Sequence, residues 1–301
     1  MTAPEQETGE RKKVCPLCGG FESKLFDRRD FRGQPVTNWL CADCGCVYQY
    51  PHLTGKALDA FYKREYRQLY QGSEGPSPKD LAVQEDRATA LLDFVCKTGA
   101  QFSRHLDIGC SAGILLKRFQ TGLGTLGVGI EPGEAYRKYA QRLGIKAYSA
   151  LEDLDRADEA RFDLISLVHV VEHLPDPIGY LQDLRHKYLT ASGWLLVEVP
   201  NLYAHDCFEV AHQVSFSEHT LSQTLRKAGY ALKVFEKHGR PRSARIPLYL
   251  TGLVQPDQIA DQITSMSVEK EYGVRWRRRT GLYRRRLVER LLPHQAWKPV
   301  G

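Results

Sequence analysis

The sequence predicts an α/β fold with a doubly wound sheet, on the basis of three observations. Short apolar runs alternate with capped helical segments between residues 104 and 254, as strands and helices do in such a sheet. A turn of small residues joins the first apolar run to a helix, and an acidic residue ends the second run. The chain has 301 residues, 42% of them hydrophobic, so it can bury the core of one large domain with appendages.

The turn after the first predicted strand indicates a cofactor site. The strand ends at Asp107, and Gly109 and Gly113 bracket the turn that leads into an apolar helix. Gly109 allows a backbone angle closed to residues with a Cβ, and Gly113 lets the helix start close to the sheet and the ligand. Glu131 ends the next strand, 22 residues after Gly109, where a carboxylate can accept hydrogen bonds from both ribose hydroxyls. The pattern therefore predicts a nucleoside cofactor.

The remaining elements follow in order along the chain. We expect a helix over 135–143, strands over 146–148 and 162–168, a helix from 177 to about 189, a strand over 193–201, a helix from 218 to 229, and two strands over 230–237 and 245–254. Asp176 and Ser217 are suited to cap the last two helices, and Gly229 to end the second one. Strand 162–168 is apolar without Gly or Pro, as in a buried parallel strand.

Two enzyme classes share parts of the glycine turn but fit it less well. Residues 109–113 also match the G-x-S-x-G nucleophile elbow of α/β hydrolases, yet that elbow follows several earlier sheet strands. A dinucleotide dehydrogenase usually has a third glycine where this chain has Leu116. The turn instead resembles the E/D-x-G-x-x-x-G loop of class I S-adenosylmethionine-dependent methyltransferases. The resemblance covers residues 106 to 254 and implies a Rossmann-like, doubly wound, seven-stranded methyltransferase sheet.

The same resemblance assigns expected site residues. It implies that S-adenosylmethionine is the cofactor and that Asp107, Gly109, Cys110, Gly113, Glu131, Glu152 and Asp153 hold it. Residues 151–153 resemble the segment that lies along the adenine, and Glu172-His173-Leu174 resembles the "EHL" signature that follows the fourth strand.

Four cysteines predict a structural zinc ribbon before this domain. Cys15, Cys18, Cys41 and Cys44 form a C-x2-C-x22-C-x2-C array, and a glycine follows each pair. This spacing lets four thiolates face one tetrahedral ion, and such a closed shell is structural. Cys46 is an alternative ligand, and two disulfides are the competing interpretation.

An N-terminal ribbon of this kind is similar to that of two methyltransferase groups. They are sugar C-methyltransferases of deoxysugar pathways and a bacterial 23S rRNA guanine methyltransferase. The chain resembles the first group more, but it does not show the long second Rossmann-like half of those enzymes. The resemblance therefore implies a small-molecule or carbohydrate acceptor, such as a nucleotide sugar or a glycan, with O-methylation open beside C-methylation.

Histidines at the carboxyl ends of the predicted strands are candidates for catalysis. A histidine base suits removal of the acceptor proton, and ligands of open sheets bind at this edge. His212 is the first choice, with His173, His169 and His205 beside it. His169-x-x-Glu172-His173 with His212 also resembles the metal-binding set of small-RNA 2′-O-methyltransferases and ubiquinone-pathway O-methyltransferases, in which an acid stands at the position of His169. Tyr66 resembles a tyrosine on a helix over the cofactor, although its spacing also fits ordinary packing.

The C-terminal segment is strongly basic. Residues 275–301 carry nine basic residues against Glu289, a balance of +8, whereas the whole chain is +6 and the rest is therefore −2. Leucines, Tyr283 and Trp276 lie among the arginines as in a basic amphipathic helix. Such a helix can rest on an anionic membrane or bind another polyanion, RNA being the less favoured partner, and a solvated tail is the alternative.

These features predict five segments and one function. We expect a disordered N-terminus (1–13), a zinc ribbon (14–52), a helical linker or lid (53–103), the methyltransferase core (104–254) and a basic tail (255–301). Because no apolar run is long enough to span a membrane or to form a signal peptide, a cytoplasmic protein, peripheral at the membrane through its tail, is expected. The alternatives are an RNA methyltransferase that uses ribbon and tail to hold RNA, and a non-catalytic zinc-ribbon adaptor.

Overall fold

A seven-stranded sheet forms the centre of the molecule. The computed structural model describes residues 13–51, 55–61, 69, 75–157, 159, 161–206, 208–257 and 265–298. In the order β10-β11-β8-β7-β4-β5-β6, the strands are β10 (Tyr230–His238), β11 (Tyr249–Pro256), β8 (Leu189–Pro200), β7 (Phe162–Val168), β4 (Arg104–Ile108), β5 (Leu126–Ile130) and β6 (Lys146–Tyr148). The strands from β4 to β8 pair in parallel, and β11 pairs antiparallel with β8 and β10. The predicted doubly wound, seven-stranded sheet is confirmed.

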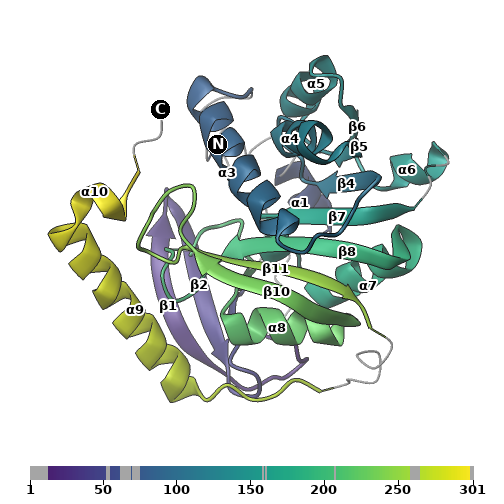
Figure 1. The fold of residues 1–301 in the computed structure, drawn as a ribbon. Coiled ribbons are helices and arrows are strands. Elements are labelled where there is room, and N and C mark those ends of the chain that lie inside the picture. The colour runs from purple at the N-terminus through teal and green to yellow at the C-terminus, as the bar shows by residue number, and fades with distance from the viewer. Residues whose placement is uncertain are drawn as a thin grey trace.

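Helices cover both faces of this sheet (Figure 1). They are α1 (Gly55–Ala60), α3 (Pro78–Cys96), α4 (Ile114–Leu123), α5 (Glu134–Arg142), α6 (Glu152–Arg156), η2 (Val171–His173), α7 (Pro177–Lys187) and α8 (Glu218–Lys227). Leu164 of β7 packs with Phe94 of α3 and Phe119 of α4, whereas the next residue, Ile165, belongs to the cluster that contains Leu181 of α7. Successive side chains of a strand point to opposite faces, so the buried apolar strand is covered on both sides.

The predicted helix caps lie where the sequence places them. The Asp176 side chain accepts a hydrogen bond from Gly179 N at 2.9 Å, and Ser217 Oγ accepts one from Thr220 N at 3.2 Å. The last strand, however, begins at Tyr249 and not at 245. The Ser243 hydroxyl accepts from the backbone N–H groups of the two residues after Ala244, and this local turn replaces the start of the strand.

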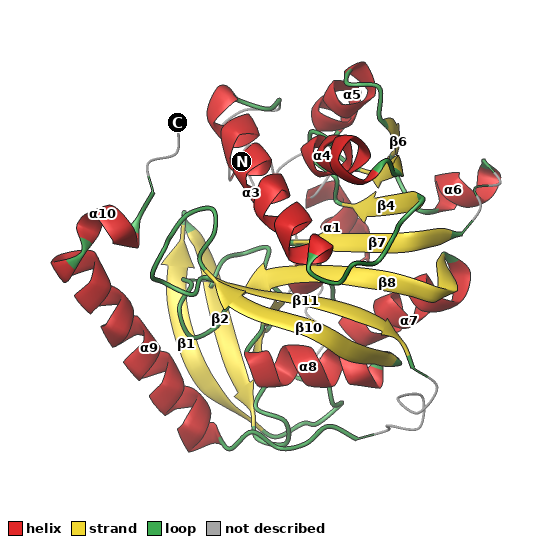
Figure 2. Cartoon of the chain, viewed as in Figure 1, coloured by secondary structure: helices red, strands yellow, loops and turns green. Residues whose placement is uncertain are grey.

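The cysteine-rich segment forms a second sheet that is joined to the core. Its strands are β1 (Ser23–Phe31), β2 (Gln34–Cys41), β3 (Val47–Gln49) and β9 (Val214–Ser215), in the order β1-β2-β3-β9. Figure 2 shows its two long strands, β1 and β2, side by side. Strand β9 belongs to the chain between β8 and α8, so the N-terminal segment pairs directly with the segment that follows the fifth strand of the main sheet. The sequence predicts a hairpin between the cysteine pairs, and β1 and β2 form it.

The four cysteines of the predicted ribbon gather at one point. Cys15 Sγ lies 3.6 Å from Cys44 Sγ, and Cys18 Sγ lies 3.5 Å from Cys41 Sγ. All four sulfurs lie within 4.8 Å of one another, and the cysteines are free thiols, so the donor set fits one tetrahedral zinc ion. Cys46 is fully buried nearby but does not belong to this group among the described residues.

The C-terminal segment forms a long helix that packs on the N-terminal sheet. It comprises α9 (Glu271–Leu291) and the short α10 (Pro293–Ala296). Glu271 pairs with Lys24 at 2.7 Å, and Arg275 Nη2 donates to Leu25 O at 2.7 Å, so α9 runs beside β1 (Figure 1). Arg278 is buried on the inner face of the helix. Within the described residues, none of the helices combines the length and hydropathy that a membrane span requires.

Candidate active site

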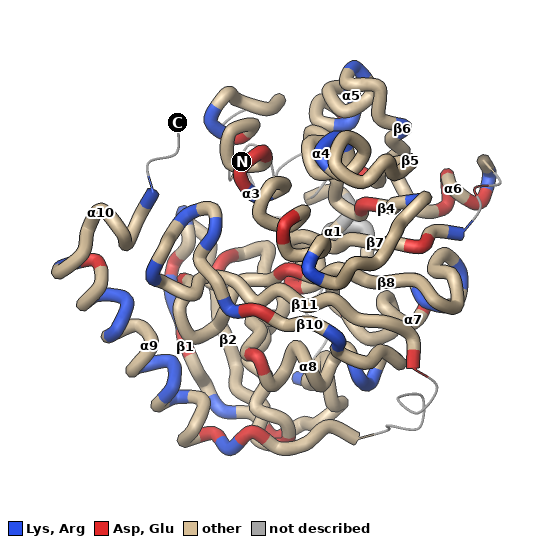
Figure 3. Tube along the Cα trace, viewed as in Figure 1, with Lys and Arg blue, Asp and Glu red and all other residues tan. Residues whose placement is uncertain are grey.

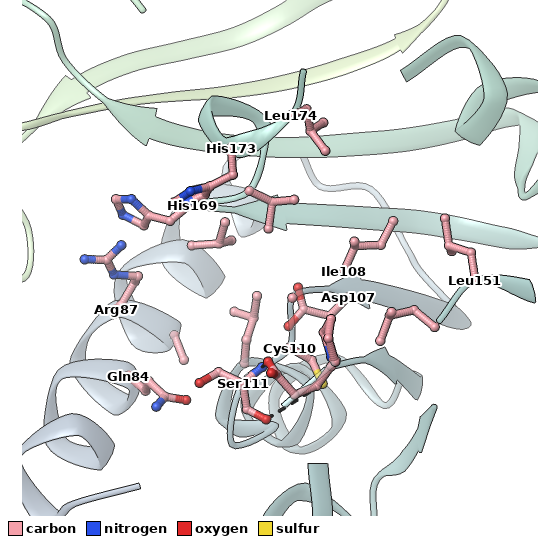
Figure 4. Close-up of a pocket in the computed structure, with 18 of the residues that line it drawn as sticks. Gln84, Arg87, Asp107, Ile108, Cys110, Ser111, Leu151, His169, His173 and Leu174 are labelled. Atoms are coloured by element: carbon pink, nitrogen blue, oxygen red, sulfur yellow. Dashed lines mark hydrogen bonds between the residues drawn. The ribbon is translucent and has the colours of Figure 1, made fainter. Parts of the chain in front are cut away.

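One cavity of about 820 Å³ opens at the carboxyl ends of β4, β5 and β7. Asp107, Cys110 and Ser111 line one end, and His169 and His173 line the other (Figure 4). Helix α3 closes one side with residues that the sequence did not identify, Gln84 and Arg87 among them. Open parallel sheets bind ligands at this edge, and the two groups of predicted residues meet there.

The glycine turn has the backbone conformation that the sequence predicts. Gly109 has φ +73°, and a Cβ there would lie 2.8 Å from a methyl carbon of Val170. Gly113 has φ +78°, and its Cβ would lie 2.9 Å from that of Ala140 on α5. Ser111 adopts a positive φ of +52° between them. Glycine is therefore needed at both ends of the turn, where the chain enters the left-handed region close to neighbouring side chains.

Glu131 connects this turn to the end of β5. Its carboxylate accepts hydrogen bonds from Gly133 N at 2.8 Å and from Ser111 N at 3.0 Å, and its side chain is 4% exposed. Each carboxylate oxygen has a further lone pair, and Glu131 lines the cavity. The residue can therefore hold the turn and accept hydrogen bonds from a ribose diol at the same time.

Asp107 lies beneath the turn. Its Oδ1 accepts from Ser166 Oγ at 2.6 Å, and Ser166 Oγ lies 2.7 Å from the ring of His105. Burial, followed by the nearby Glu131, raises the pKa of Asp107 to about 7. Of the two predicted adenine-side acids, Glu152 lines the cavity, whereas Asp153 accepts from Ser149 and Ala150 at the start of α6.

The histidines after β7 and in the loop after β8 come together around Glu172. His173 and His212 have ring centroids 4.9 Å apart, and His173 Nε2 lies 3.9 Å from Glu172 Oε1. One ligand atom from each of Glu172, His173 and His212 lies within 4.8 Å of the others. His212 itself is not among the described residues that line the cavity, and it reaches the site through His173.

Glu172 has an incomplete set of partners. The side chain is 1% exposed, and its Oε2 has no hydrogen-bond partner in the described structure. Burial raises the pKa of Glu172 to about 8, because a charged carboxylate loses its hydration there. A buried acceptor of this kind beside two imidazoles fits a divalent cation, since the cation restores charge balance.

His169 lies at the other side of Glu172. Its Nδ1 lies 3.2 Å from Glu172 Oε1, and its φ of +57° is unusual for a residue with a Cβ. Burial lowers the pKa of His169 well below its usual value, and the cationic Arg87 adds to this effect. His169 is therefore a neutral imidazole at the cavity wall.

Arg87 and Glu198 form an ion pair next to His169. This pair was not identified from the sequence. Arg87 Nη1 lies 3.0 Å from Glu198 Oε1, and the carboxylate is fully buried. Thr251 Oγ1 also donates to Glu198 at 2.9 Å. A lone acid in the apolar strand 193–199 was the available signal for Glu198, whereas nothing in the pattern of α3 distinguishes Arg87.

The sequence also named Tyr66 and His205 as candidates. Tyr66 is outside the described residues. His205 is half-buried in the loop after β8, with its ring centroid 5.9 Å from that of Tyr249, and is not among the described cavity-lining residues. Burial and the nearby His212 lower the pKa of His205 to about 3.

Comparison with known proteins identifies similar sequences for half of the chain. Residues 82–233 match the family described as a methyltransferase domain. The ubiquinone biosynthesis O-methyltransferase of Hahella chejuensis is 33% identical over 98 residues, which is 30% of this chain and 41% of that protein. The enzyme of the same name from Cereibacter sphaeroides is 35% identical over 139 residues, 44% of this chain and 54% of that protein. The chain thus spans about half, or less, of the length of these curated relatives.

Solved structures with low sequence identity share the fold. The 1,6-didemethyltoxoflavin-N1-methyltransferase of Burkholderia thailandensis, solved with 1,6-didemethyltoxoflavin and S-adenosylhomocysteine, has a TM-score of 0.54 and 18% identity, over 77% of this chain and all of that one. The plantazolicin methyltransferase BamL, solved with a desmethylplantazolicin analogue and S-adenosylhomocysteine, has a TM-score of 0.50 and 14% identity, over 67% and 94%.

Proposed function

We propose that this chain, which belongs to the methyltransferase-domain family, is an S-adenosylmethionine-dependent methyltransferase that methylates a hydroxyl group of a small molecule. The observation that carries this proposal is the group formed by Glu172, His173 and His212, of which His173 lines the cavity that begins at the glycine turn. The names of the similar ubiquinone biosynthesis O-methyltransferases support oxygen as the atom methylated.

The cofactor end of the cavity has defined tasks in this proposal. S-adenosylmethionine supplies an electrophilic methyl group on a sulfonium when it is bound. When the cofactor is bound, Glu131 would accept hydrogen bonds from its ribose hydroxyls, and Glu152 and the Gly109 turn would help to hold it. Asp107 supports the turn from below through Ser166. These residues would fix the position of the cofactor relative to the histidine end of the cavity, and positioning supplies much of the rate in such transfers.

The histidine end of the cavity holds the residues that would activate the acceptor hydroxyl. We assign Glu172, His173 and His212 as ligands of a divalent cation, because the orphaned Glu172 oxygen and two imidazoles fit that donor set. A bound cation would lower the pKa of an acceptor hydroxyl. His169, a neutral imidazole that lines the cavity, is placed to accept a hydrogen bond from that hydroxyl and to orient it, and the proton that the hydroxyl gives up passes to water. Direct deprotonation by His173 or His212 without a cation is the competing mechanism.

A carbohydrate hydroxyl, on a nucleotide sugar or glycan, remains the acceptor that we propose. The mixed lining supports it, because apolar side chains such as Leu115 line the cavity together with the polar Gln84 and the cationic Arg242. Ordered hydroxyl recognition needs such dispersed polar groups.

The deciding experiment measures methyl transfer to a nucleotide sugar and to a simple phenol by mass spectrometry, before and after a chelator. We expect the chelator to lower turnover by about a hundredfold or more and an added divalent ion to restore it, with His173→Ala and His212→Ala equally damaging. His294→Ala, at an exposed position of α10, is the control. Zinc content must be followed in parallel, so that loss from the four cysteines is recognised. Turnover that resists the chelator but falls in His212→Ala would favour His212 as the base.

We also propose that the outer face of α9 contacts an anionic membrane surface. Trp276 and Tyr283 are 56% and 64% exposed and lie two helical turns apart on that face. Arg279, Arg284 and Arg286 are exposed beside them, and Figure 3 shows basic residues along the length of the helix. Aromatic side chains between arginines suit the interface of an anionic bilayer. RNA as the partner, and with it an RNA acceptor, is the alternative that the same charges support.

A further inference from the structure

The segment after β8 carries two of the candidate histidines but has little regular structure of its own. We call residues 201–206 and 208–213 the acceptor loop; they contain His205 and His212 and end at the short β9. Loops of this length need partners to hold one conformation. Besides its contacts with η2 and with residues beside β9 and β11, the acceptor loop is contacted by the C-terminal helix and by the N-terminal sheet.

Arg278 of α9 holds the first part of the acceptor loop. Its guanidinium is buried, with 7% of the residue exposed. Nη1 donates to the carbonyl of Leu202 and, at 2.6 Å, to the carbonyl of His205. A buried arginine in place of an apolar residue on the inner helix face is costly unless its donors are used, and here they fix two loop carbonyls.

Arg29 of β1, in the N-terminal sheet, contacts the same part of the acceptor loop. Phe208 is 3% exposed, and its ring lies 4.8 Å from the guanidinium carbon of Arg278 and 4.9 Å from that of Arg29 on β1. Asp206 pairs with Arg29 Nη1 at 2.7 Å and lies 3.7 Å from Arg278 Nη2. One aromatic ring and one acid of the loop are thus held jointly by α9 and β1.

Close packing of α9 against the loop backbone completes the contact. A Cβ on Gly281 would lie only 2.0 Å from Tyr203 O, so this glycine allows the helix to approach the loop. Arg285 Nη1 donates to Ala204 O at 3.2 Å, and the Tyr203 hydroxyl donates to Glu269 at 2.9 Å.

The C-terminal end of the acceptor loop contacts Glu172 and His173. Gln213 N donates to Glu172 O at 2.8 Å, and His173 Nδ1 lies 3.0 Å from Ala211 O. Gln49 of β3, with its amide nitrogen turned toward them, donates to the carbonyls of His212 and Glu209 at 3.0 Å each. A shift of the loop would therefore displace His212 from Glu172 and His173.

We propose that α9 and the N-terminal sheet form a clamp that positions His212 at the acceptor site, with Arg278 as its central positioning residue. The proposal rests on the proposed function of Glu172, His173 and His212. Residues 271–298 lie outside the family match at 82–233, so the clamp is an addition of this chain to the shared domain. The inner face of α9 performs this role, and the exposed arginines stay available on the outer face.

The test uses neighbouring residues of α9 as matched controls. Arg278→Met and Gly281→Ala disturb the inner face, whereas Arg279→Met and Gly273→Ala make the same chemical changes at an exposed arginine and at a glycine with open space around its Cβ. Alanine favours helix more than glycine, so a defect in Gly281→Ala comes from the contact with Tyr203 and not from a weaker helix.

We expect amide hydrogen exchange across 202–213 to become at least tenfold faster in Arg278→Met and Gly281→Ala and to stay unchanged in both controls. With the acceptor that gives turnover, kcat should fall at least tenfold while the dissociation constant of S-adenosylhomocysteine stays within twofold, and Arg278→Lys should recover part of kcat. Unchanged loop exchange in both inner-face variants would overturn the clamp. Faster exchange with unchanged kcat would overturn the positioning of His212. Absence of turnover in the unaltered protein contradicts the proposed function alone, because the exchange measurement still decides whether the clamp exists.

Discussion

Replacing Glu131 by alanine tests the cofactor site most directly. The carboxylate is 4% exposed and accepts from Gly133 N and Ser111 N, so it is desolvated and fixed before any ligand binds. Loss of its hydrogen bonds to a ribose diol should weaken S-adenosylhomocysteine binding by about 1.5 to 3 kcal/mol, which is roughly tenfold to 150-fold in the dissociation constant. The two backbone N–H groups also lose their acceptor, at a cost of about 1 to 3 kcal/mol of stability for each one that stays buried.

Calorimetric titration with S-adenosylhomocysteine, at a temperature where circular dichroism shows the variant to be folded, separates these two effects. Glu131→Gln should lie between the unaltered protein and Glu131→Ala, because its amide can accept from one N–H but presents a donor to the other. Glu134→Ala is the control, since Glu134 lies three residues further on, is exposed and pairs with Lys138 on α5. A dissociation constant within twofold of the unaltered value in a folded Glu131→Ala protein would refute the placement of the ribose at this carboxylate.

Three other predictions concern the metal, the pH dependence and the surface. Cys15→Ser and Cys41→Ser should each remove about one zinc per chain and unfold the N-terminal sheet, and full zinc retention in both would exclude these ligands. Burial raises the pKa of Asp107 from 3.8 to about 7. Between these two pH values the folded protein keeps a proton on Asp107 that the unfolded chain releases, so the free energy of unfolding falls as the pH rises. Urea denaturation should therefore show Asp107→Asn gaining stability relative to the unaltered protein between pH 4 and pH 7, and a constant difference would contradict the buried acid. Arg279→Glu with Arg286→Glu should abolish sedimentation with phosphatidylglycerol vesicles at low salt without changing S-adenosylhomocysteine affinity. Binding of RNA but not vesicles by the unaltered protein would show that the partner is a nucleic acid.

Elements with a strong local pattern were predictable from sequence. Strand β7 was expected at the bounds that it has, and the capped starts of α7 and α8 agree as well, because side-chain periodicity and capping act within a few residues. The start of β11 was wrong by four residues. The Ser243 hydroxyl accepts hydrogen bonds from the backbone of the next turn, and these bonds replace strand pairing there. The sequence pattern gives little indication of such a turn.

The group formed by Glu172, His173 and His212 was only partly predictable. His173 and Glu172 are neighbours in sequence, so their proximity follows from the chain itself. The contact of His212 with His173 depends on how the acceptor loop folds back across the sheet edge, and β3 of the N-terminal sheet fixes that path through Gln49. The C-terminal arginines were expected to act together as a basic tail, yet Arg278 is buried against the loop while Arg279 is exposed.

The sequence by itself therefore determined the sheet, the glycine turn, the acid at the end of β5 and the four-cysteine array, because each depends on spacing along a short stretch of chain. Tertiary structure alone decided which polar groups meet: Arg87 pairs with Glu198 across 111 residues, and Arg278 binds the carbonyl of His205 across 73. The physical reason is that a buried charge or carbonyl must find a partner wherever the fold supplies one, and no periodicity in the chain records which partner that is.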